Sequence, residues 1–592
     1  MKAIILAAGI ARRMLPLSEN RHKTLLPIGE STVLGRIMDG LLELGVRDIT
    51  LVTGHRAGEL RDALATRYPE LPIRYVHNPR YAETNNIVSL ALALEQVPAD
   101  DDVILIESDL IFAPSLLRAL TLPGDDNLAL VDRYRPGMDG TVVAVEGGFI
   151  TGVFPPHLQG ESFRHDDKFK TLNIYRFNRD FLEKRFKPLL SCYANLIDGN
   201  VYYELVLGML VNMQRERIRA LVVDAPWAEV DDPNDFASAC FTFEPGERAR
   251  ILERGAGGHW NFDLLDFHFL RNLHFPTDAM IAAVRQALPG LLRNYGSSQE
   301  VLDQKLGWHL KTTPGRAIAL HGASQIYPGL PELLGPGPVL SPQPTFGEYR
   351  RTFPGQQTYA DAPGIDLAAL EAQAAGVSTI VFVSPNNPTG TTLPTEWLHD
   401  FAARHPKQRV IVDESFVDFS GERPLVERLE EKPLGNVLVL KSLSKTLGVP
   451  GLRLGYAYTS DPELQRAIRA RIPIWNLSAP AEFFLELSLK FRPELTASFQ
   501  RSAADREDLA ARLRALDCVA QVFPSGGDFL LVRLRGEAPA AGRRMLEALL
   551  ARNLYVKDVS ERFSPPAPWL RLAVRLPADH ARLCEALAAV AP

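Results

Sequence analysis

The sequence contains little cysteine, no long apolar run and no excess of basic residues. Its four cysteines lie far apart without a Cys-x-x-Cys pair, which excludes a zinc ribbon and a disulfide scaffold and is typical of a reducing, cytoplasmic compartment. No apolar run approaches the roughly 18 residues that a membrane span needs, so we expect no membrane span. With 71 acidic and 65 basic residues the formal charge is -6, which argues against nucleic acid as a partner and leaves small anionic molecules as substrates.

The first residues, MKAIILAAGIARRM, have the outline of a short export signal, with one lysine before an apolar run. Arg12 and Arg13 cut that run short, and no export-type cleavage site follows. An apolar run that opens a chain and ends in glycine is more typical of the first buried strand of an α/β domain. We therefore interpret this run as a strand and expect a cytoplasmic protein.

At roughly 150 residues per domain, the 592 residues correspond to several compact lobes, and 46% hydrophobic residues are enough to give them cores. Short β-rich runs alternate with helical stretches in two blocks, which predicts parallel sheets covered by helices. We predict an N-terminal domain over 1–240 and a C-terminal domain over 241–592. The second would begin with a connector at about 241–260 and end in a small lobe at about 539–592.

The first predicted strand ends in a loop suited to phosphate binding. Leu6, Ala8 and Gly9 bring small residues and free N–H groups to the strand end, where they can approach a phosphate chain. Arg13 and Lys23 add positive charge. The combination of LAAG, an arginine four residues after the glycine, and KTLLP resembles the nucleotidyltransferases that make NDP-sugars and CDP-activated alcohols. This resemblance implies a Rossmann-like α/β domain and a catalytic role for Lys23.

One position in this loop departs from the family pattern. The family usually has a second glycine where Ala11 stands. Alanine permits a tight loop if its φ is negative, and that is the conformation we expect here.

Two strand ends carry acidic residues. Asp109 follows the apolar run ILIES, and Asp231 lies in WAEVDD with Glu229 and Asp232 beside it. The resemblance implies that Asp109 and Asp231 bind Mg²⁺ at the α-phosphate of the nucleotide, with Glu229 and Asp232 as less certain neighbours. Two carboxylates, substrate phosphates and waters would suit an octahedral Mg²⁺ ion.

Within this family the sequence is most similar to CTP:phosphocholine and 2-aminoethylphosphonate cytidylyltransferases. The similarity lies in His22-Lys23, VTGH at 52–55 and YAETNNI at 81–87. It implies that a phosphate or phosphonate oxygen of the acceptor attacks the α-phosphorus of CTP and releases pyrophosphate, with positioning and charge stabilisation as the main catalytic effects. Asn85 and Asn86 offer amide groups to a pyrimidine edge or to the acceptor. Further pocket candidates are Lys170, Asn173, Tyr202, Tyr203 and Glu204.

The C-terminal block carries a second set of strand-end motifs. Asn387 opens NPTG after the run TIVFVSP, Asp413 ends RVIVD, and SLSK delivers Lys445 after NVLVLK, with Arg453 eight residues later. In this order the motifs resemble the aspartate aminotransferase superfamily. This resemblance covers most of 260–592. It implies a fold type I enzyme, with a large α/β domain and a small α+β lobe, that uses pyridoxal 5'-phosphate.

The resemblance also implies roles around the cofactor ring. Lys445 would bind the cofactor covalently and, when released, move a proton between the substrate carbon and the cofactor. Asp413 would pair with the pyridine nitrogen so that the ring can accept electrons. Asn387 would bind the ring hydroxyl and Phe346 would stack on the ring. Many relatives have tyrosine three residues after the aspartate, where this chain has Phe416, so Asn387 would make its contact alone.

Other residues match the phosphate and substrate positions of that superfamily. Ser442, Arg453 and the Gly322-Ala323-Ser324 turn would hold the cofactor phosphate. Arg571 would bind a substrate carboxylate through two hydrogen bonds. Tyr295 matches the tyrosine that relatives donate to the neighbouring subunit's phosphate site, which implies a homodimer formed through the aminotransferase domain.

Within this superfamily the sequence resembles histidinol-phosphate aminotransferase and threonine-phosphate decarboxylase; GGH at 257–259 and LLDF at 264–267 are similar to the latter. Both act on amino compounds that carry a phosphate. We therefore predict a bifunctional enzyme that forms 2-aminoethylphosphonate from phosphonoacetaldehyde by transamination and couples it to CMP from CTP. Two alternatives stay open: a phosphoserine decarboxylase joined to a phosphoethanolamine or phosphocholine cytidylyltransferase, and an inactive, cofactor-binding sensor domain.

Overall fold

The computed structural model describes residues 1–98, 100–124, 126–135, 137–160, 162–213, 216–362 and 364–590. The chain forms two compact units, Met1–Phe262 and Asp263–Pro592. The segment expected as a connector at 241–260 falls in the first unit, where α8 (Pro233–Phe243) and α9 (Arg248–Gly255) contact each other. In the described part of the chain no helix is long and apolar enough to cross a membrane.

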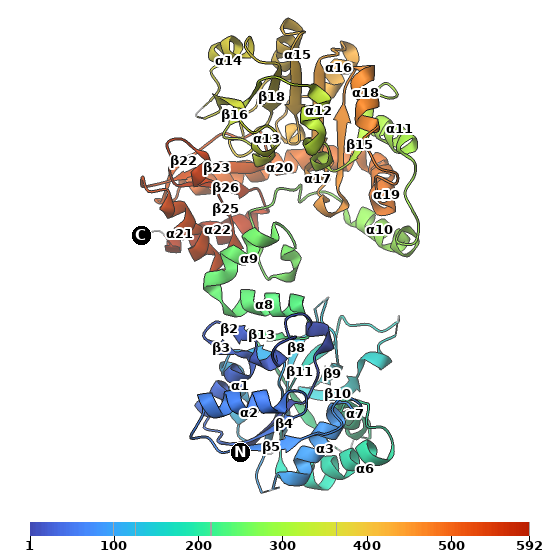
Figure 1. The fold of residues 1–592 in the computed structure, drawn as a ribbon, viewed down its shortest axis with the longest axis vertical. Coiled ribbons are helices and arrows are strands. Elements are labelled where there is room, and N and C mark those ends of the chain that lie inside the picture. Colours follow the sequence, from blue (N-terminus) through green and yellow to red (C-terminus); the bar gives the residue numbers. More distant parts are fainter. Residues whose placement is uncertain are drawn as a thin grey trace. The chain divides into compact units, whose positions relative to one another are not determined.

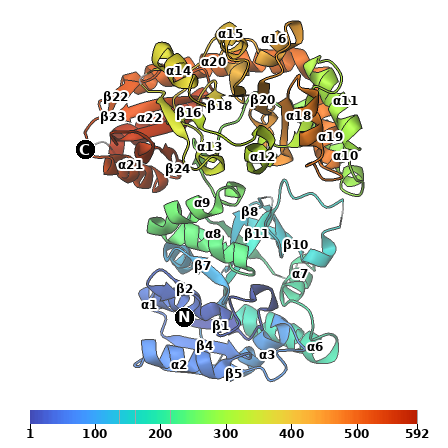
Figure 2. The same cartoon turned by 45° about the horizontal axis from the view of Figure 1, so that its top comes forward.

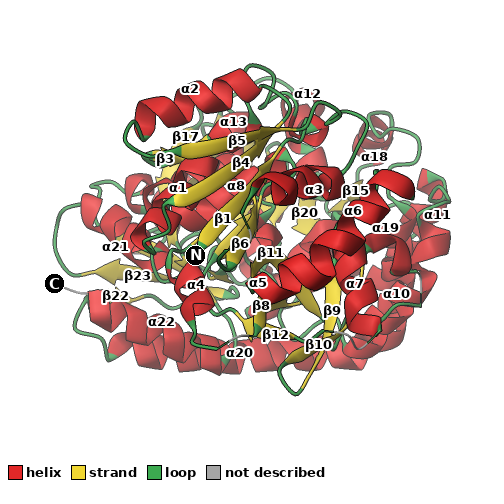
Figure 3. Ribbon diagram, turned by 90° about the horizontal axis from the view of Figure 1, so that it is seen from below, coloured by secondary structure: helices red, strands yellow, loops and turns green. Residues whose placement is uncertain are grey.

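The first unit is built on a nine-stranded mixed sheet. Four neighbouring strands, β5 (Ile73–His77), β4 (Asp48–Thr53), β1 (Lys2–Ala7) and β6 (Val103–Glu107), run parallel, and Figure 3 shows them side by side in this order. The sheet continues through β11 (Phe169–Phe177), β8 (Asn127–Arg133), β12 (Ile218–Val222), β10 (Phe149–Phe154) and β9 (Val142–Glu146). The predicted Rossmann-like α/β domain is confirmed.

Helices cover both faces of this sheet because its strands alternate their apolar side chains between two cores. Ile5 of β1 packs in one core, and its neighbours Ile4 and Leu6 pack in the other. Figure 1 shows the helices of the two faces on opposite sides of the sheet. One face carries α1 (Val33–Glu43) and α2 (Ala57–Arg67), and the other carries α3 (Asn86–Gln96), α6 (Lys187–Leu196) and α7 (Glu204–Asn212).

The second unit contains a seven-stranded sheet in the order β15-β21-β20-β19-β18-β16-β17. Its strands are β15 (Ala317–His321), β21 (Leu454–Tyr458), β20 (Val437–Ser442), β19 (Arg409–Asp413), β18 (Thr379–Val383), β16 (Val339–Gln343) and β17 (Gln357–Ala360). Because β18, β19 and β20 are parallel neighbours, their carboxyl ends bring the NPTG turn, Asp413 and the SLSK motif to one edge of the sheet.

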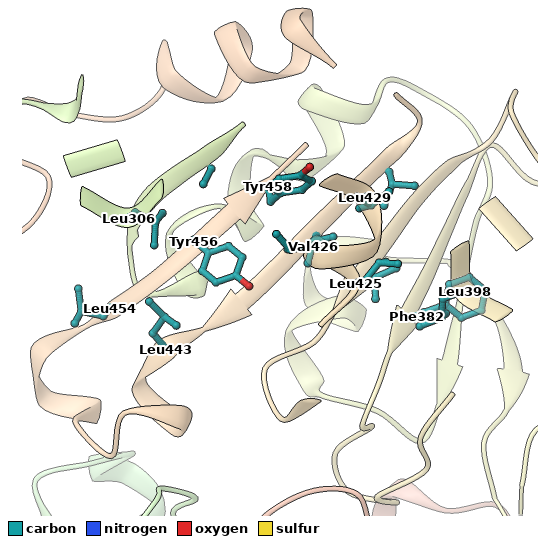
Figure 4. Close-up of a cluster of buried hydrophobic side chains, with 14 of the residues drawn as sticks. Leu306, Phe382, Leu398, Leu425, Val426, Leu429, Leu443, Leu454, Tyr456 and Tyr458 are labelled. Atoms are coloured by element: carbon teal, nitrogen blue, oxygen red, sulfur yellow. The ribbon is translucent and has the colours of Figure 1, made fainter. Parts of the chain in front are cut away.

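Figure 4 shows part of the core that holds this edge in place. Tyr456 and Tyr458 of β21 and Phe382 of β18 pack in one buried cluster with leucines of the covering helices. Leu398 comes from α15 (Thr395–Arg404), and Leu425 comes from α16 (Leu425–Glu431). The strands that carry the NPTG turn, Asp413 and the SLSK motif at their ends are therefore supported by a packed core.

A smaller antiparallel sheet completes the second unit, with the order β22-β23-β26-β25. Figure 2 shows its strands beside α21 and α22. The elements are β22 (Val519–Val522), β23 (Phe529–Leu534), α21 (Ala540–Leu550), β25 (Lys557–Asp558), β26 (Trp569–Ala573) and α22 (Pro577–Val590). This lobe takes in strands that precede residue 539, where the sequence prediction began it. The large α/β domain with a small α+β lobe is confirmed.

Candidate active sites

The first unit has a cavity of about 510 Å³ at the carboxyl ends of β1 and β6. The parallel strands deliver the loop after β1 and the acids after β6 to the same edge of the sheet. Nine residues predicted for nucleotide or metal binding lie in the wall of this cavity: Leu6, Ala8, Gly9, Arg13, Lys23, Asn85, Asn86, Asp109 and Asp231. Asp232, which the sequence placed beside the metal, instead caps α8 and accepts from the amides of Asn234 and Asp235.

The loop after β1 differs from the expectation at one residue. Ala11 has φ 55 and ψ 49, so the expected negative φ was wrong. The chain turns there to begin a short helical turn at Arg12–Met14, and the amide of Met14 donates to the carbonyl of Ala11 at 3.0 Å. Left-handed backbone is costly for a residue with a Cβ, so this loop carries local strain beside the cavity.

Lys23 is the centre of a buried charge cluster. Its Nζ lies 2.9 Å from Oδ2 of Asp109 and 3.2 Å from Oδ1 of Asp231, and Arg13 donates to Oδ2 of Asp231 at 2.6 Å. Burial opposes the charge on Lys23, but the two carboxylates outweigh it and raise the pKa of Lys23. Burial likewise works against ionised Asp109, yet Lys23 lowers its pKa overall. Within the described residues no three His, Cys, Asp or Glu side chains form a metal-binding group.

Besides Asp139, three further carboxylates line the same cavity: Glu107, Glu204 and Glu229. Asn86 donates to Glu107 at 2.8 Å, whereas the buried Oε2 of Glu204 has no hydrogen-bond partner in the described chain. Burial is the main cause of a raised pKa at all three; the pKa of Glu107 lies well above its ordinary value, and that of Glu229 is about 7. Sequence reasoning named Glu204 and Glu229 but missed Glu107.

Two predicted substrate residues of this unit lie behind the cavity wall. Lys170 is buried, with Nζ 3.2 Å from Oε2 of Glu229 and 2.9 Å from the carbonyl of Thr171. Tyr203 is buried in the core beside Tyr175. Its neighbour Tyr202 lines the cavity instead. The structure thus places Lys170 and Tyr203 where they support the wall.

The second unit has a cavity of about 270 Å³. Nine of the predicted cofactor and substrate residues lie in its wall: Ala323, Ser324, Phe346, Asn387, Asp413, Ser442, Lys445, Arg453 and Arg571. Tyr295 lies outside this wall. Its side chain is exposed and stacks on Trp475, with the ring centroids 4.3 Å apart.

Asp413 is held by hydrogen bonds that the sequence did not reveal. Tyr327 and Tyr349 donate to its Oδ2 at 3.0 and 2.9 Å. Ser415 donates to Oδ1 through its hydroxyl, at 2.6 Å, and through its amide. Phe416 lines the cavity where many relatives have tyrosine. The two tyrosines lie 64 and 86 residues before Asp413, and no local motif marks them.

Arg453 and Ser324, which the sequence predicts to bind the cofactor phosphate, contact each other. Nη2 of Arg453 donates to Oγ of Ser324 at 3.0 Å. Gly322, which precedes this turn, has φ +72, and a Cβ on it would lie 2.5 Å from Nη2 of Arg453. Only glycine fits there without moving the guanidinium.

Lys445 is buried in the wall of the cavity. Burial lowers its pKa to about 8; Asp528 opposes this effect, and Arg571, Arg453 and Arg271 add to it. An amine with a pKa near neutrality can act as a base and as a nucleophile under ordinary conditions.

The wall of this cavity also carries Arg571, Arg562 and Lys557, of which only Arg571 was predicted. Burial lowers the pKa of Arg571 to about 10. Arg571 donates to Oδ1 of Asn387 at 3.2 Å and to the carbonyl of His268, and Arg562 donates to the carbonyl of Thr345. In the described chain the recorded hydrogen-bond acceptors of both guanidinium groups are therefore neutral, which suits the binding of an anionic ligand.

Two family models match the sequence. Residues 266–587 match the model of aminotransferase class I and II. Residues 3–146 match the model of the MobA-like NTP transferase domain.

One relative spans the whole chain. CMP-5'-(3-aminopropyl)phosphonate synthase of Streptomyces rubellomurinus is 33% identical over 610 aligned positions, which cover 100% of this chain and 95% of that protein. Histidinol-phosphate aminotransferase 2 of Gluconobacter oxydans is 28% identical over 58% of this chain and 94% of its own length. Among solved structures, histidinol-phosphate aminotransferase of Clostridium acetobutylicum has a TM-score of 0.49 and 20% identity, over 55% of this chain and 99% of its own.

Proposed function

The chain belongs over residues 266–587 to the class I and II aminotransferases and carries a MobA-like NTP transferase domain before them, and from this we propose a bifunctional enzyme of aminophosphonate metabolism. The second unit forms an aminoalkylphosphonate from the matching phosphono-aldehyde by transamination. The first unit transfers CMP from CTP to that product. The observation that carries this proposal is the similarity, over the full chain, to a synthase whose name contains a CMP-activated aminophosphonate.

In the first unit Lys23 and Arg13 would neutralise the triphosphate of CTP. Asp109 and Asp231 are suited to Mg²⁺ because their oxygens converge within 2.9 and 3.2 Å of the same nitrogen of Lys23, and carboxylate oxygens are the ligands this ion prefers. When bound, Mg²⁺ would add positive charge at the reacting phosphate. The phosphonate is already an anionic nucleophile, so the chain has only to align it with the α-phosphorus.

The acidic wall of this cavity favours an acceptor with an ammonium group. Six carboxylates line it, against the two cations Arg13 and Lys23. Burial and mutual repulsion raise the pKa values of Glu107 and Glu229. A cation placed among these carboxylates would favour their ionised forms. A plain sugar phosphate would bring only negative charge to this wall. An aminoalkylphosphonate brings an ammonium at the opposite end from its reacting oxygen.

In the second unit the residues suit pyridoxal 5'-phosphate, which when bound supplies the electron sink for transamination. Asp413, fixed by four hydrogen bonds, would hold the proton on the pyridine nitrogen. Arg453 and Ser324 would bind the phosphate. The amine of Lys445, with a pKa of about 8, would carry the proton to and from the substrate carbon.

The cationic side of the same cavity suits substrates with two anionic groups or one dianionic group. Arg571 would bind the carboxylate of the amino-acid donor. Arg562 and Lys557 add two cations to the same cavity wall, and they would bind the phosphonate of the aldehyde in the second half-reaction. Guanidinium groups whose recorded acceptors are neutral leave their charge for such a ligand.

The active form of the second unit is proposed to be a homodimer. The exposed Tyr295 ring, stacked on Trp475, would reach the phosphate site of a partner subunit. Sedimentation of the purified protein tests this, and a monomer that retains full transaminase activity would contradict it.

The proposed function is tested by two measurements on the purified protein. The first is pyrophosphate release from CTP or UTP with 2-aminoethylphosphonate, 3-aminopropylphosphonate, phosphoethanolamine or phosphocholine. We expect CTP with one of the two phosphonates to give the highest kcat/KM. Preference for phosphoethanolamine or phosphocholine would contradict the acceptor.

The second measurement distinguishes transamination from decarboxylation. An amino-acid donor should convert the bound cofactor to its amine form, which has a different absorption spectrum, and the phosphono-aldehyde should convert it back. Release of CO₂ from phosphoserine without this interconversion would favour the decarboxylase alternative.

A further inference from the structure

Asp528 is a buried carboxylate that the proposed mechanism does not use. It is 3% exposed and directly precedes β23. Neither Oδ1 nor Oδ2 has a hydrogen-bond partner in the described chain. Asp303, a buried carboxylate of the same unit, instead accepts from the amide of Ala319 and from Arg469, both at 2.8 Å. A buried carboxylate without donors is unfavourable unless nearby charge compensates it.

The compensating charge comes from three different elements. Asp528 interacts electrostatically with Lys445 on α17 (Leu443–Thr446), with Arg571 on β26 and with Arg506 on α20 (Arg492–Arg514). Within the described residues, Asp528 is the one charged group recorded as favouring the ammonium form of Lys445. Arg571, Arg453 and Arg271 disfavour that form. The carboxylate is therefore the negative member of an otherwise cationic cluster.

The backbone fixes Asp528 relative to this cluster. The amide of Val574 donates to its carbonyl at 2.8 Å, and Nη1 of Arg506 donates to the carbonyl of Gly527 at 2.9 Å. Three residues after Asp528, Leu531 of β23 pairs with Arg571 of β26. The strand pair that presents Arg571 to the cavity thus also holds the carboxylate.

The walls of the cavity exclude direct contact between Asp528 and the substrate. Asp528 is not among the lining residues, and Asp413 is the one carboxylate that lines the cavity in the described chain, together with Lys445, Arg453, Lys557, Arg562 and Arg571. A lysine among so many cations would hold a proton poorly. A counter-charge behind the wall can correct this without repelling an anionic substrate inside the cavity.

We propose that Asp528 is a positioning residue for Lys445: its ionised carboxylate stabilises the ammonium that Lys445 becomes each time its amine takes a proton from the substrate carbon. Lys445 would then give this proton up again, and Asp528 itself would take up none. The inference rests on the proposed role of Lys445. It is consistent with the pKa of Asp528, which burial raises only to about 6, so that the group is ionised at neutral pH.

The test uses Asp528→Asn, which removes the charge and keeps the shape. In the cofactor-free full-length protein, the pKa of Lys445 is measured from the pH dependence of its reaction with an amine-directed reagent, read by mass spectrometry at that residue. We expect the variant to lower this pKa by about one unit. The pH dependence of the transamination half-reaction should shift in the same direction, and Asp528→Glu should restore most of the wild-type profile.

Asp303→Asn is the control, because Asp303 is also buried but is not among the groups that act on Lys445; it should leave the Lys445 titration unchanged. Circular dichroism and thermal unfolding compared with the wild type show in each variant that the second unit is folded. If Asp528→Asn does not accumulate as folded protein, Asp528→Ser removes the same charge. An unchanged Lys445 titration in Asp528→Asn or in Asp528→Ser overturns the proposal. Failure of the proposed function is seen separately, as a wild-type protein that binds no pyridoxal phosphate at Lys445.

Discussion

The side-chain nitrogen of Lys23 lies 2.9 Å from Oδ2 of Asp109. The two residues are 86 positions apart and meet because the loop after β1 and the end of the neighbouring parallel strand β6 open onto the same edge of the sheet. A buried ammonium and a buried carboxylate at this distance keep each other charged. Both charges are then available to a nucleotide triphosphate and its metal ion.

Asp109→Asn should therefore abolish CMP transfer. The substitution removes the charge that holds Lys23 and that would bind Mg²⁺, and we expect kcat to fall by at least about 100-fold. Pyrophosphate release measures the loss, and the absorption spectrum of bound pyridoxal phosphate should stay as in the wild type. Loss of that spectrum as well would mean that the two units depend on each other structurally.

Lys445→Ala is the reciprocal change. It should remove the absorption band of the lysine-bound cofactor and abolish transamination, because the substitution removes the amine proposed to bind the cofactor and to carry the proton. CMP transfer to an added aminoalkylphosphonate should remain within about twofold of the wild type. A variant that behaves like the wild type in every assay would support the alternative of an inactive sensor domain.

CMP transfer should depend on pH through the acidic wall. Burial raises the pKa of Glu229 to about 7, so this carboxylate is protonated below that pH and ionised above it. The ionised form attracts a cationic acceptor. The KM for the aminophosphonate should therefore fall as pH rises through about 7, and the KM in Glu229→Gln should lose most of this dependence.

Arg562→Gln should weaken phosphonate binding in the second unit. Arg562 lines the cavity, and its recorded hydrogen-bond acceptor is the neutral carbonyl of Thr345. We expect the KM for the phosphono-aldehyde to rise by about tenfold or more, in line with a lost charged hydrogen bond. Arg552→Gln, a change in the same lobe, is the control. In the described chain the recorded side-chain hydrogen bond of Arg552 goes to the carbonyl of Ala548. Equal KM values for the two variants would exclude Arg562 from the phosphonate site.

Ala11→Gly should stabilise the first unit. Ala11 has φ 55, and removing its Cβ relieves about 1 kcal/mol of backbone strain. Thermal unfolding followed in the first unit should shift upward. Ala119→Gly, where φ is -61, should shift it downward, because glycine only adds chain entropy there. A downward shift for Ala11→Gly would contradict the strain assigned to this loop.

The sequence predicted what depends on strand ends and missed what depends on tertiary packing. Lys445, Asp413 and Asn387 lie at the ends of apolar runs, so short-range patterns locate them, and the cavity collects all three. Tyr327 and Tyr349 reach Asp413 from segments with no motif of their own. The φ of Ala11 depends on the turn that follows it. The glycine-rich stretch at 255–258 does not reveal that the helices before it belong to the first unit.

The sequence also does not show which charged residues the fold brings together. The stretch around Arg562 is typical of a surface turn, and the stretch around Asp528 is typical of the start of a strand. Their chemical interest arises only because the fold brings Arg562 and Arg571 of the small lobe to the cavity that Lys445 also lines. Such residues can be found from a structure but not from the spacing of residues along one sequence.

The most direct test of the whole account is one reaction followed by phosphorus NMR. The purified protein is given CTP, Mg²⁺, an amino-acid donor and phosphonoacetaldehyde or its three-carbon homologue. We predict a CMP–aminoalkylphosphonate product whose formation stops when the donor is omitted and resumes when the aminoalkylphosphonate itself is supplied. Intact CTP in the presence of both aminoalkylphosphonates would contradict the account.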